Sequence, residues 1–246
     1  MNPSARLLAA LSLCGALCAG SAEADYTFMG HCTDDPSVSP EDVVSACTVF
    51  ITKAFQENWM LEDVPKAMRF QAAAYEKLGK TGQAERELAS AVAKYPSYFG
   101  AWEDLGKMLE KDKGPGALMA AMNAMVQKNS NDPDALNEAC WVGATTGEEL
   151  DTALAYCNGA LQLKPGEASY LDTRALANLR KNNFAGAIAD ATAALAKNPK
   201  LSGSLYVRGV ARLKSGDTAG GNADIAAAKA MDAKVADTYA GYGAAP

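Results

Sequence analysis

Small side chains recur along the chain at a nearly constant spacing, and this pattern predicts the elements of the fold. Two columns of small residues, seven positions apart, advance in steps of 33, 36, 34 and 34 residues. The first column is Ala84, Ala117, Ala153, Ala187 and Gly221, and the second is Ala91, Ala124, Ala160, Ala194 and Ala228. A third column twelve residues before the first holds Ala72, Gly106 (one residue nearer), Trp141, Ala175 and Gly209. The period predicts stacked units in which small residues let helices approach closely.

Turn-forming residues divide each period into two helices. The helix formers Ala, Leu, Glu, Lys and Gln fill most positions between the columns. Breakers fall at 80–82, 113–116 and 215–217, where a turn between two helices belongs, and prolines close three units at Pro96, Pro165 and Pro199. A single helical pair cannot bury its apolar face alone, so we expect neighbouring pairs to stack into a solenoid.

The motif Trp102-Glu-Asp-Leu105-Gly106 matches the W-x-x-L-G opening of a known repeat, and one unit is matched almost completely, by Ala72, Tyr75, Leu78, Gly79, Ala84, Leu88, Ala91 and Pro96. On these residues the chain resembles the tetratricopeptide repeat family, whose unit is a 34-residue helix-turn-helix. The resemblance implies an all-α, right-handed superhelical solenoid of about five repeats, at 65–98, 99–133, 134–167, 168–201 and 202–235, with a C-terminal tail at 236–246. The third unit departs from the pattern, because Trp141 stands where a small residue belongs and 145–147 break its first helix early.

The first residues have the pattern of an export signal. Arg6 precedes an apolar run at 7–19, and Ala22-Glu23-Ala24 has the form that a signal peptidase cleaves. We predict a cleaved signal peptide at 1–24, an N-terminal capping segment at 25–64, and an exported protein with the periplasm as the favoured compartment. Lipid attachment is the weaker reading, since a leucine precedes both Cys14 and Cys18. The apolar run is too short for a membrane span, and we expect none elsewhere.

Composition and charge narrow the function. Of the 246 residues, 49% are hydrophobic and 21% charged, as in globular proteins, and the formal net charge of −6 argues against nucleic acid as a partner. His31 is the single histidine, and phosphate loops, nucleophile elbows and zinc spacings are missing from the sequence. We therefore expect no enzyme activity, no cofactor and no metal. A hydrolase built on carboxylates alone stays as an alternative, although it needs two acids in one cleft.

Four cysteines follow the signal, and an exported chain permits disulfides among them. In the register of the resemblance, Cys140 and Cys157 both point into the interface between the two helices of the third unit, so a bridge within that repeat is plausible. Cys32 and Cys47 are then the remaining pair, which would tether a capping helix that begins after Ser39. Four free thiols buried as small hydrophobic residues are the alternative.

Two arginines continue the column of Cys140 in the next two units. Arg174 and Arg208 each have an acid on the second helix of their unit, Asp190 and Asp224 respectively. An arginine at a partly interior position needs a carboxylate to offset its desolvation, so we predict structural ion pairs rather than substrate-binding arginines.

The resemblance also implies a concave groove lined by the first helix of each repeat. The first two units would present charges of both signs there, whereas the last two present a more apolar set: Asp172, Leu176, Leu179, Arg180, Tyr206, Val210, Leu213 and Lys214. Apolar residues at exposed positions mark interaction surfaces, so this set is the candidate partner-binding site. Packing against a neighbouring helix or the tail is the alternative for the same residues.

Together these features favour a non-enzymatic scaffold of the bacterial cell envelope that binds a protein or peptide in its groove. A self-associating structural subunit, whose groove is covered by its own tail or by a second copy, is a further alternative. A homo-oligomer therefore stays open, and the partner's identity lies beyond the sequence, because repeat scaffolds host many binding functions.

Overall fold

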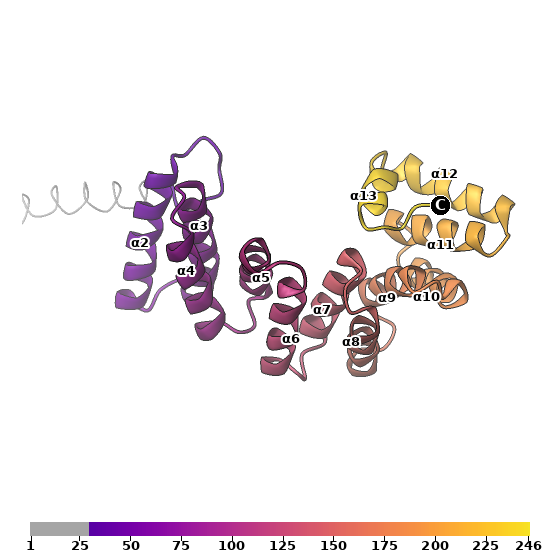
Figure 1. The fold of residues 1–246 in the computed structure, drawn as a ribbon, viewed down its shortest axis with the longest axis horizontal. Helices are drawn as coiled ribbons and strands as arrows, with labels where there is room; N and C mark the ends of the chain where they lie inside the picture. The colour runs from indigo at the N-terminus through magenta and orange to yellow at the C-terminus, as the bar shows by residue number, and fades with distance from the viewer. Residues whose placement is uncertain (1–29) are drawn as a thin grey trace, which may run out of the picture. The chain divides into compact units, whose positions relative to one another are not determined.

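The computed structural model describes residues 30–246, so the predicted signal peptide at 1–24 lies outside the described residues. Every regular element within 30–246 is a helix (Figure 1). The described residues divide into two compact units, 30–104 and 105–246, and the boundary falls inside α5 (Phe99–Lys113). The all-helical repeat architecture expected from the sequence is confirmed.

The first unit contains α2 (Pro40–Glu57), a 3-10 turn (Leu61–Asp63), α3 (Val64–Lys77) and α4 (Thr81–Lys94), with α2 packed on α3 and α3 on α4. The start of α2 follows directly from its sequence. Ser39 Oγ accepts a hydrogen bond from the Asp42 amide at 3.2 Å, and Pro40 occupies the first helical position, where its missing N–H costs nothing. Cys47 is fully buried on the inner face of this helix.

The second unit continues with antiparallel helical pairs. Its helices are α6 (Ala117–Lys128), α7 (Pro133–Thr146), α8 (Leu150–Leu163), α9 (Ala168–Arg180), α10 (Phe184–Lys197), α11 (Ser202–Lys214), α12 (Thr218–Met231) and α13 (Val235–Gly241). Each of α7, α9 and α11 is the first helix of a pair, and these three also pack side by side: α7 on α9, and α9 on α11. The repeat extends to the helix caps, since Asn183 and Asp217, 34 residues apart, accept hydrogen bonds from the Gly186 and Gly220 amides.

The small-residue columns mark the points where paired helices cross. Ala175 and Ala187 in the fourth repeat are fully buried. In the fifth repeat a Cβ atom on Gly209 would lie 2.9 Å from the Gly221 carbonyl oxygen, so only glycine allows this approach of α11 to α12. Close backbone approach is thus the reason for the spacing seen in the sequence.

Two repeats use a different register from the columns. In the second, Ala117 and Ala124 are half-buried, and a Cβ on Gly106 would lie 2.9 Å from Leu118 Cα, one position beyond the expected residue. In the third, Gly143 lies at the crossing with the second helix, since a Cβ atom there would lie 2.6 Å from that of Ala153. The bulky indole of Trp141 does not fit between two helix backbones, and this side chain is left half-buried for another contact.

Candidate partner-binding site

In each of the last three repeats, the residue at one equivalent position of the first helix is linked to the second helix by a disulfide or an ion pair. In the third repeat the tie is the disulfide from Cys140 on α7 to Cys157 on α8, with Cα atoms 5.4 Å apart. A second disulfide joins Cys32 to Cys47 and tethers the chain before α2 to that helix. Both are the pairings expected from the sequence.

Arginines make the equivalent connection in the fourth and fifth repeats. Arg174 donates to both carboxylate oxygens of Asp190 at 2.8 and 2.7 Å, and Arg208 donates to both oxygens of Asp224 at 2.7 and 2.8 Å. Two parallel hydrogen bonds determine the orientation of the guanidinium as well as bind it. These groups are engaged in structural ion pairs, which is the role we predicted for them.

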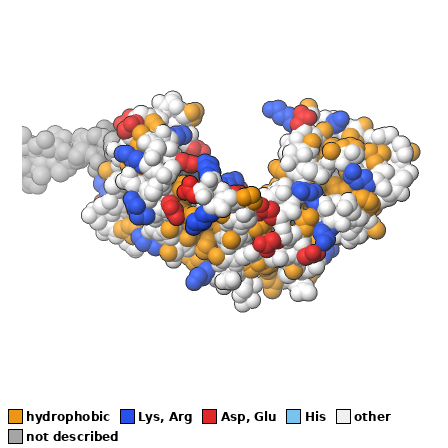
Figure 2. All heavy atoms as spheres, viewed as in Figure 1, with side chains coloured by type: hydrophobic (Ala, Val, Ile, Leu, Met, Phe, Trp, Pro, Cys, Tyr) orange, Lys and Arg blue, Asp and Glu red, His pale blue; other side chains and the backbone are white. Residues whose placement is uncertain are grey.

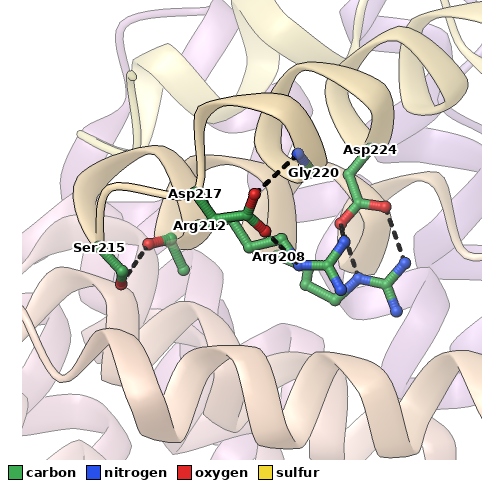
Figure 3. Close-up of polar contacts among 7 residues, drawn as sticks. Arg208, Arg212, Ser215, Asp217, Gly220 and Asp224 are labelled. Atoms are coloured by element: carbon green, nitrogen blue, oxygen red, sulfur yellow. Dashed lines mark hydrogen bonds and ion pairs between the residues drawn. The ribbon is translucent and has the colours of Figure 1, made fainter.

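Each carboxylate has a further donor that the sequence analysis missed. Asn178 Nδ2 donates to Asp190 at 2.9 Å, and Arg212 Nη1 donates to Asp224 at 2.7 Å. Figure 3 shows Asp224 facing Arg208 and Arg212, while Asp217 lies at the start of the same helix and contacts Gly220. The 34-residue offset from 178 to 212 was a signal that could have found both donors.

The structure buries half of the eight predicted partner-binding residues. The exposed fraction is 1% for Leu176, 3% for Leu179, 2% for Tyr206 and 0% for Val210. The remaining four are more accessible: Asp172, Arg180 and Leu213 are partly buried, and Lys214 is exposed.

The cover over these residues includes the end of the chain itself. We call residues 235–246 the C-terminal segment; it begins with α13, and its Val235, Tyr239 and Ala244 belong to the same hydrophobic cluster as Leu176 and Tyr206. Packing against the tail was the alternative that the sequence left open for this set. The C-terminal segment therefore occupies part of this face, over Tyr206 and Arg180.

Aromatic contacts carry the segment from the last repeat back to the third. The Tyr239 and Tyr206 ring centroids lie 5.5 Å apart, and the Tyr242 ring meets Trp141 on α7 edge-on at 5.6 Å. Tyr239 and Tyr242 also contact each other at 5.5 Å. The half-buried indole that is excluded from the α7–α8 crossing thus packs against the C-terminal segment.

Arg180 anchors the main chain of the segment. Its Nη1 donates to the carbonyl oxygens of Ala144 and Thr145 at 3.1 and 3.2 Å, near the C-terminal end of α7, and also to that of Tyr242. Carbonyls at a helix C-terminus carry partial negative charge and attract a cation. Burial lowers the pKa of Arg180, and no ion pair of residues 30–246 gives this guanidinium a carboxylate partner.

Two glycines make room for this guanidinium. A Cβ atom on Gly147 or on Gly243 would lie 3.0 Å from Arg180 Cζ, so the planar group sits against the α-carbon of Gly147, the C-cap of α7, and against that of Gly243 in the segment. Both glycines have positive φ, at 83° and 69°, which a side chain would also disfavour.

A partly buried carboxyl group lies near Tyr239 of the segment. Asp172 accepts a hydrogen bond from the Ser204 hydroxyl, and burial raises the pKa of Asp172. Burial, together with the nearby charge of Asp172, also raises the pKa of Tyr239. The occupied face therefore combines apolar side chains with a carboxyl, a hydroxyl and a guanidinium.

The first unit presents a different surface. Arg69 Nε donates to Asp104 at 2.5 Å, and its guanidinium lies 5.8 Å from the Tyr98 ring centroid. Figure 2 shows basic and acidic side chains intermixed over the visible side of this unit. That side of the first unit therefore carries charge of both signs.

Two cavities of the first unit bear on the hydrolase alternative. One of about 200 Å³ lies beside Cys32 and includes Asp63, and one of about 390 Å³ lies beside Tyr98 and includes Glu62. Each has a single carboxylate among its lining residues, whereas hydrolysis by paired acids needs two. Within residues 30–246, no cluster of three or more His, Cys, Asp or Glu could hold a metal, and no helix is both long and apolar enough to cross a membrane.

Comparison with known proteins supports the repeat architecture. Residues 71–133 match the tetratricopeptide repeat family model. No curated protein matches the chain. A tetratricopeptide repeat protein from Parabacteroides merdae is similar in structure, with a TM-score of 0.58 and 15% identity over 90% of this chain and 82% of that one.

Two further solved structures share the fold. PilW, described as a widely conserved type IV pilus biogenesis factor, has a TM-score of 0.54 and 14% identity over 74% of this chain and 89% of its own. YrrB, described as a protein of this repeat class with an unusual peptide-binding site, has a TM-score of 0.50 and 14% identity over 77% of this chain and 96% of its own. The match of residues 71–133, the helical pairs and these structural neighbours show the tetratricopeptide repeat fold in this chain.

Proposed function

We propose that the protein is a non-enzymatic scaffold of the bacterial cell envelope that holds a protein or peptide partner on the face formed by α7, α9 and α11. Asp172, Leu176, Leu179, Arg180, Tyr206, Val210, Leu213 and Lys214 are the residues assigned to that partner. Rigid stacked helices pre-organise such a surface, so that little ordering entropy is lost when a partner binds.

The observation that carries the proposal is the way a stretch of polypeptide already lies on this face. The Tyr239 ring packs against Tyr206, the Tyr242 ring packs against Trp141, and the Tyr242 carbonyl accepts from Arg180. Side-chain pockets combined with main-chain hydrogen bonds are the general means of recognising a peptide. The fold shared with YrrB, whose description names a peptide-binding site, is consistent with this role.

Two features support the cell envelope as the location. Both disulfides would be stable in an oxidising compartment and are uncommon in the cytosol. The residues before Asp25 have the pattern of an export signal.

Site-specific photo-cross-linking tests the proposal. A photoreactive phenylalanine analogue replaces Lys214, which is exposed on α11 within the proposed site, or Lys229, which is exposed on α12 outside it. After irradiation in the envelope fraction, we expect a discrete adduct from position 214 and none from 229. Equal adducts from both positions, or none from 214, would refute this face as the partner site.

The self-associating structural subunit stays as a second candidate, because the C-terminal segment covers part of the face that a partner would use. Native mass spectrometry distinguishes the two. A stable dimer whose formation depends on the segment would favour the structural subunit, whereas a monomer that cross-links to another protein would favour the scaffold.

A further inference from the structure

We infer that the C-terminal segment is an intramolecular ligand, and that the partner that replaces it is a peptide with two aromatic side chains three residues apart, followed by small residues. The model for this partner is Tyr239-Ala240-Gly241-Tyr242-Gly243-Ala244. The inference rests on the proposed function and specifies the chemistry of the partner and its competition with the chain's own end.

The C-terminal segment extends further than is needed to cover the last repeat. Packing α13 against α11 and α12 already covers the end of the solenoid. The chain nevertheless continues past α13, where the Tyr242 carbonyl accepts from Arg180 on α9 and the Tyr242 ring meets Trp141 on α7. It therefore spans three successive first helices, as a bound peptide would.

The residues beneath the segment include polar groups that can bind a peptide. A purely structural cover would be most stable over apolar side chains, since burying polar groups without full compensation costs free energy. Here the segment lies over the partly buried Arg180 guanidinium and near the partly buried Asp172 carboxyl. Because Arg180 is satisfied by main-chain carbonyls, the backbone of another peptide can replace Tyr242 in that bond.

Few anchors hold the segment in place. Helix α13 has seven residues and no side-chain hydrogen bond at its N-cap. Most of the segment is exposed, and only Val235, Tyr239 and Ala244 are buried. A tethered ligand has an effective concentration of roughly millimolar, so a free peptide of equal intrinsic affinity is strongly outcompeted.

A peptide-binding experiment on the full chain tests the inference. The probe is a fluorescent synthetic peptide with the sequence of residues 235–246, titrated by anisotropy. In Tyr239→Ala/Tyr242→Ala, which weakens the attached segment, we expect the peptide to bind at least about tenfold more tightly than in wild type. The exposed change Thr238→Ala is the matched control and should bind as wild type does.

A third substitution identifies the site. Adding Arg180→Gln to the double variant should abolish the gain, because the donor to the peptide carbonyl is lost. The inference is overturned if the double variant keeps the wild-type circular dichroism and does not bind the peptide, or if binding is unaffected by Arg180→Gln.

Hydrogen exchange on the wild-type chain keeps the test decisive if the double variant does not fold. The amides of Gly243 and Ala244 donate to Ala240 and Tyr239 carbonyls, so they are protected only while the segment keeps this structure. Exchange at least about tenfold faster than in the middle of α11 indicates opening without global unfolding. Equal exchange would show a permanent cover and would overturn the inference.

Two other results separate this inference from the proposed function. A dimer with exchanged segments, seen by native mass spectrometry, would identify a second copy as the occupant and overturn the assignment to a foreign peptide. Successful cross-linking at position 214 without any peptide binding would leave the scaffold function standing and refute displacement of the segment.

Discussion

Removing the carboxylate of Asp224 should destabilise the protein far more than removing an equally close but exposed ion pair. Asp224 accepts from Arg208 and Arg212, with N···O distances of 2.7 Å to each, and its side chain is 9% exposed. Asp151 pairs with Lys181 at the same 2.7 Å, but the Asp151 side chain is 87% exposed. The distances match, so the two carboxylates differ in burial and in the number of cations that each one binds.

The size of the effect follows from what each substitution leaves behind. Asp224→Ala leaves two guanidiniums, 16% and 29% exposed, without their shared acceptor. Removing one partner of a buried pair costs about 3–5 kcal/mol, and the partial exposure of both arginines favours the lower end, about 3 kcal/mol. Asp151→Ala should cost less than about 1 kcal/mol, as exposed pairs do.

Arg208→Met gives an intermediate case. Asp224 then keeps the hydrogen bond from Arg212, and the methionine side chain retains part of the packing, so we expect a loss of about 1–2 kcal/mol. The free energy of unfolding is measured by urea titration with circular dichroism, with both disulfides oxidised. Losses for Asp224→Ala and Asp151→Ala that agree within about 0.5 kcal/mol would refute burial as the deciding factor.

Three further predictions concern the second unit. Burial raises the pKa of Asp172, so the folded state favours the neutral carboxyl. The stability that depends on the neutral form is present below the ordinary pKa of a carboxyl and is lost as pH rises through the raised pKa. Asp172→Asn should therefore raise the melting temperature at neutral pH, and this gain should vanish in acid. Replacing both Cys140 and Cys157 by alanine should cost about 3 kcal/mol of unfolding free energy in a urea titration. Gly209→Ala should cost about 1–3 kcal/mol in the same assay because the new methyl group meets the backbone of α12, whereas Gly241→Ala, with open space around it, should not show this steric loss.

Each of these three has a definite contrary result. A gain from Asp172→Asn that is the same in acid and at neutral pH would show that the charge of the carboxyl is not its cause. Equal stability of the cysteine variant and the oxidised wild type would show that the disulfide does not constrain the unfolded chain. Equal losses for the two alanine substitutions would remove close helix approach as the reason for glycine at position 209.

Local spacing explains why the sequence predicted so much of the scaffold. The disulfide from Cys140 to Cys157 and the ion pair from Arg208 to Asp224 each join two helices of one repeat, 17 and 16 residues apart. Equivalent contacts recur in successive repeats at the same spacing. A column of residues at that spacing therefore predicts the contacts without knowledge of the whole fold. The missed donor Arg212 obeys the same rule.

The register of individual repeats was less predictable. The column assigned the crossing of the third repeat to Trp141, but the residue whose Cβ would meet Ala153 on the second helix is Gly143. The spacing of small residues shows that the first helix needs one at the crossing, but not which position along the helix meets the second helix.

The sequence by itself determined the helical repeat, the cross-links within repeats and the apolar character of the face on α9 and α11. Only the tertiary structure decided that this face is covered, since the covering residues do not belong to the repeat. Arg180 and Tyr242 are 62 residues apart, and no periodic pattern brings them together. Contacts within a unit are set by local helix geometry, whereas the course of a nonperiodic chain end depends on the surface that the folded repeats present to it.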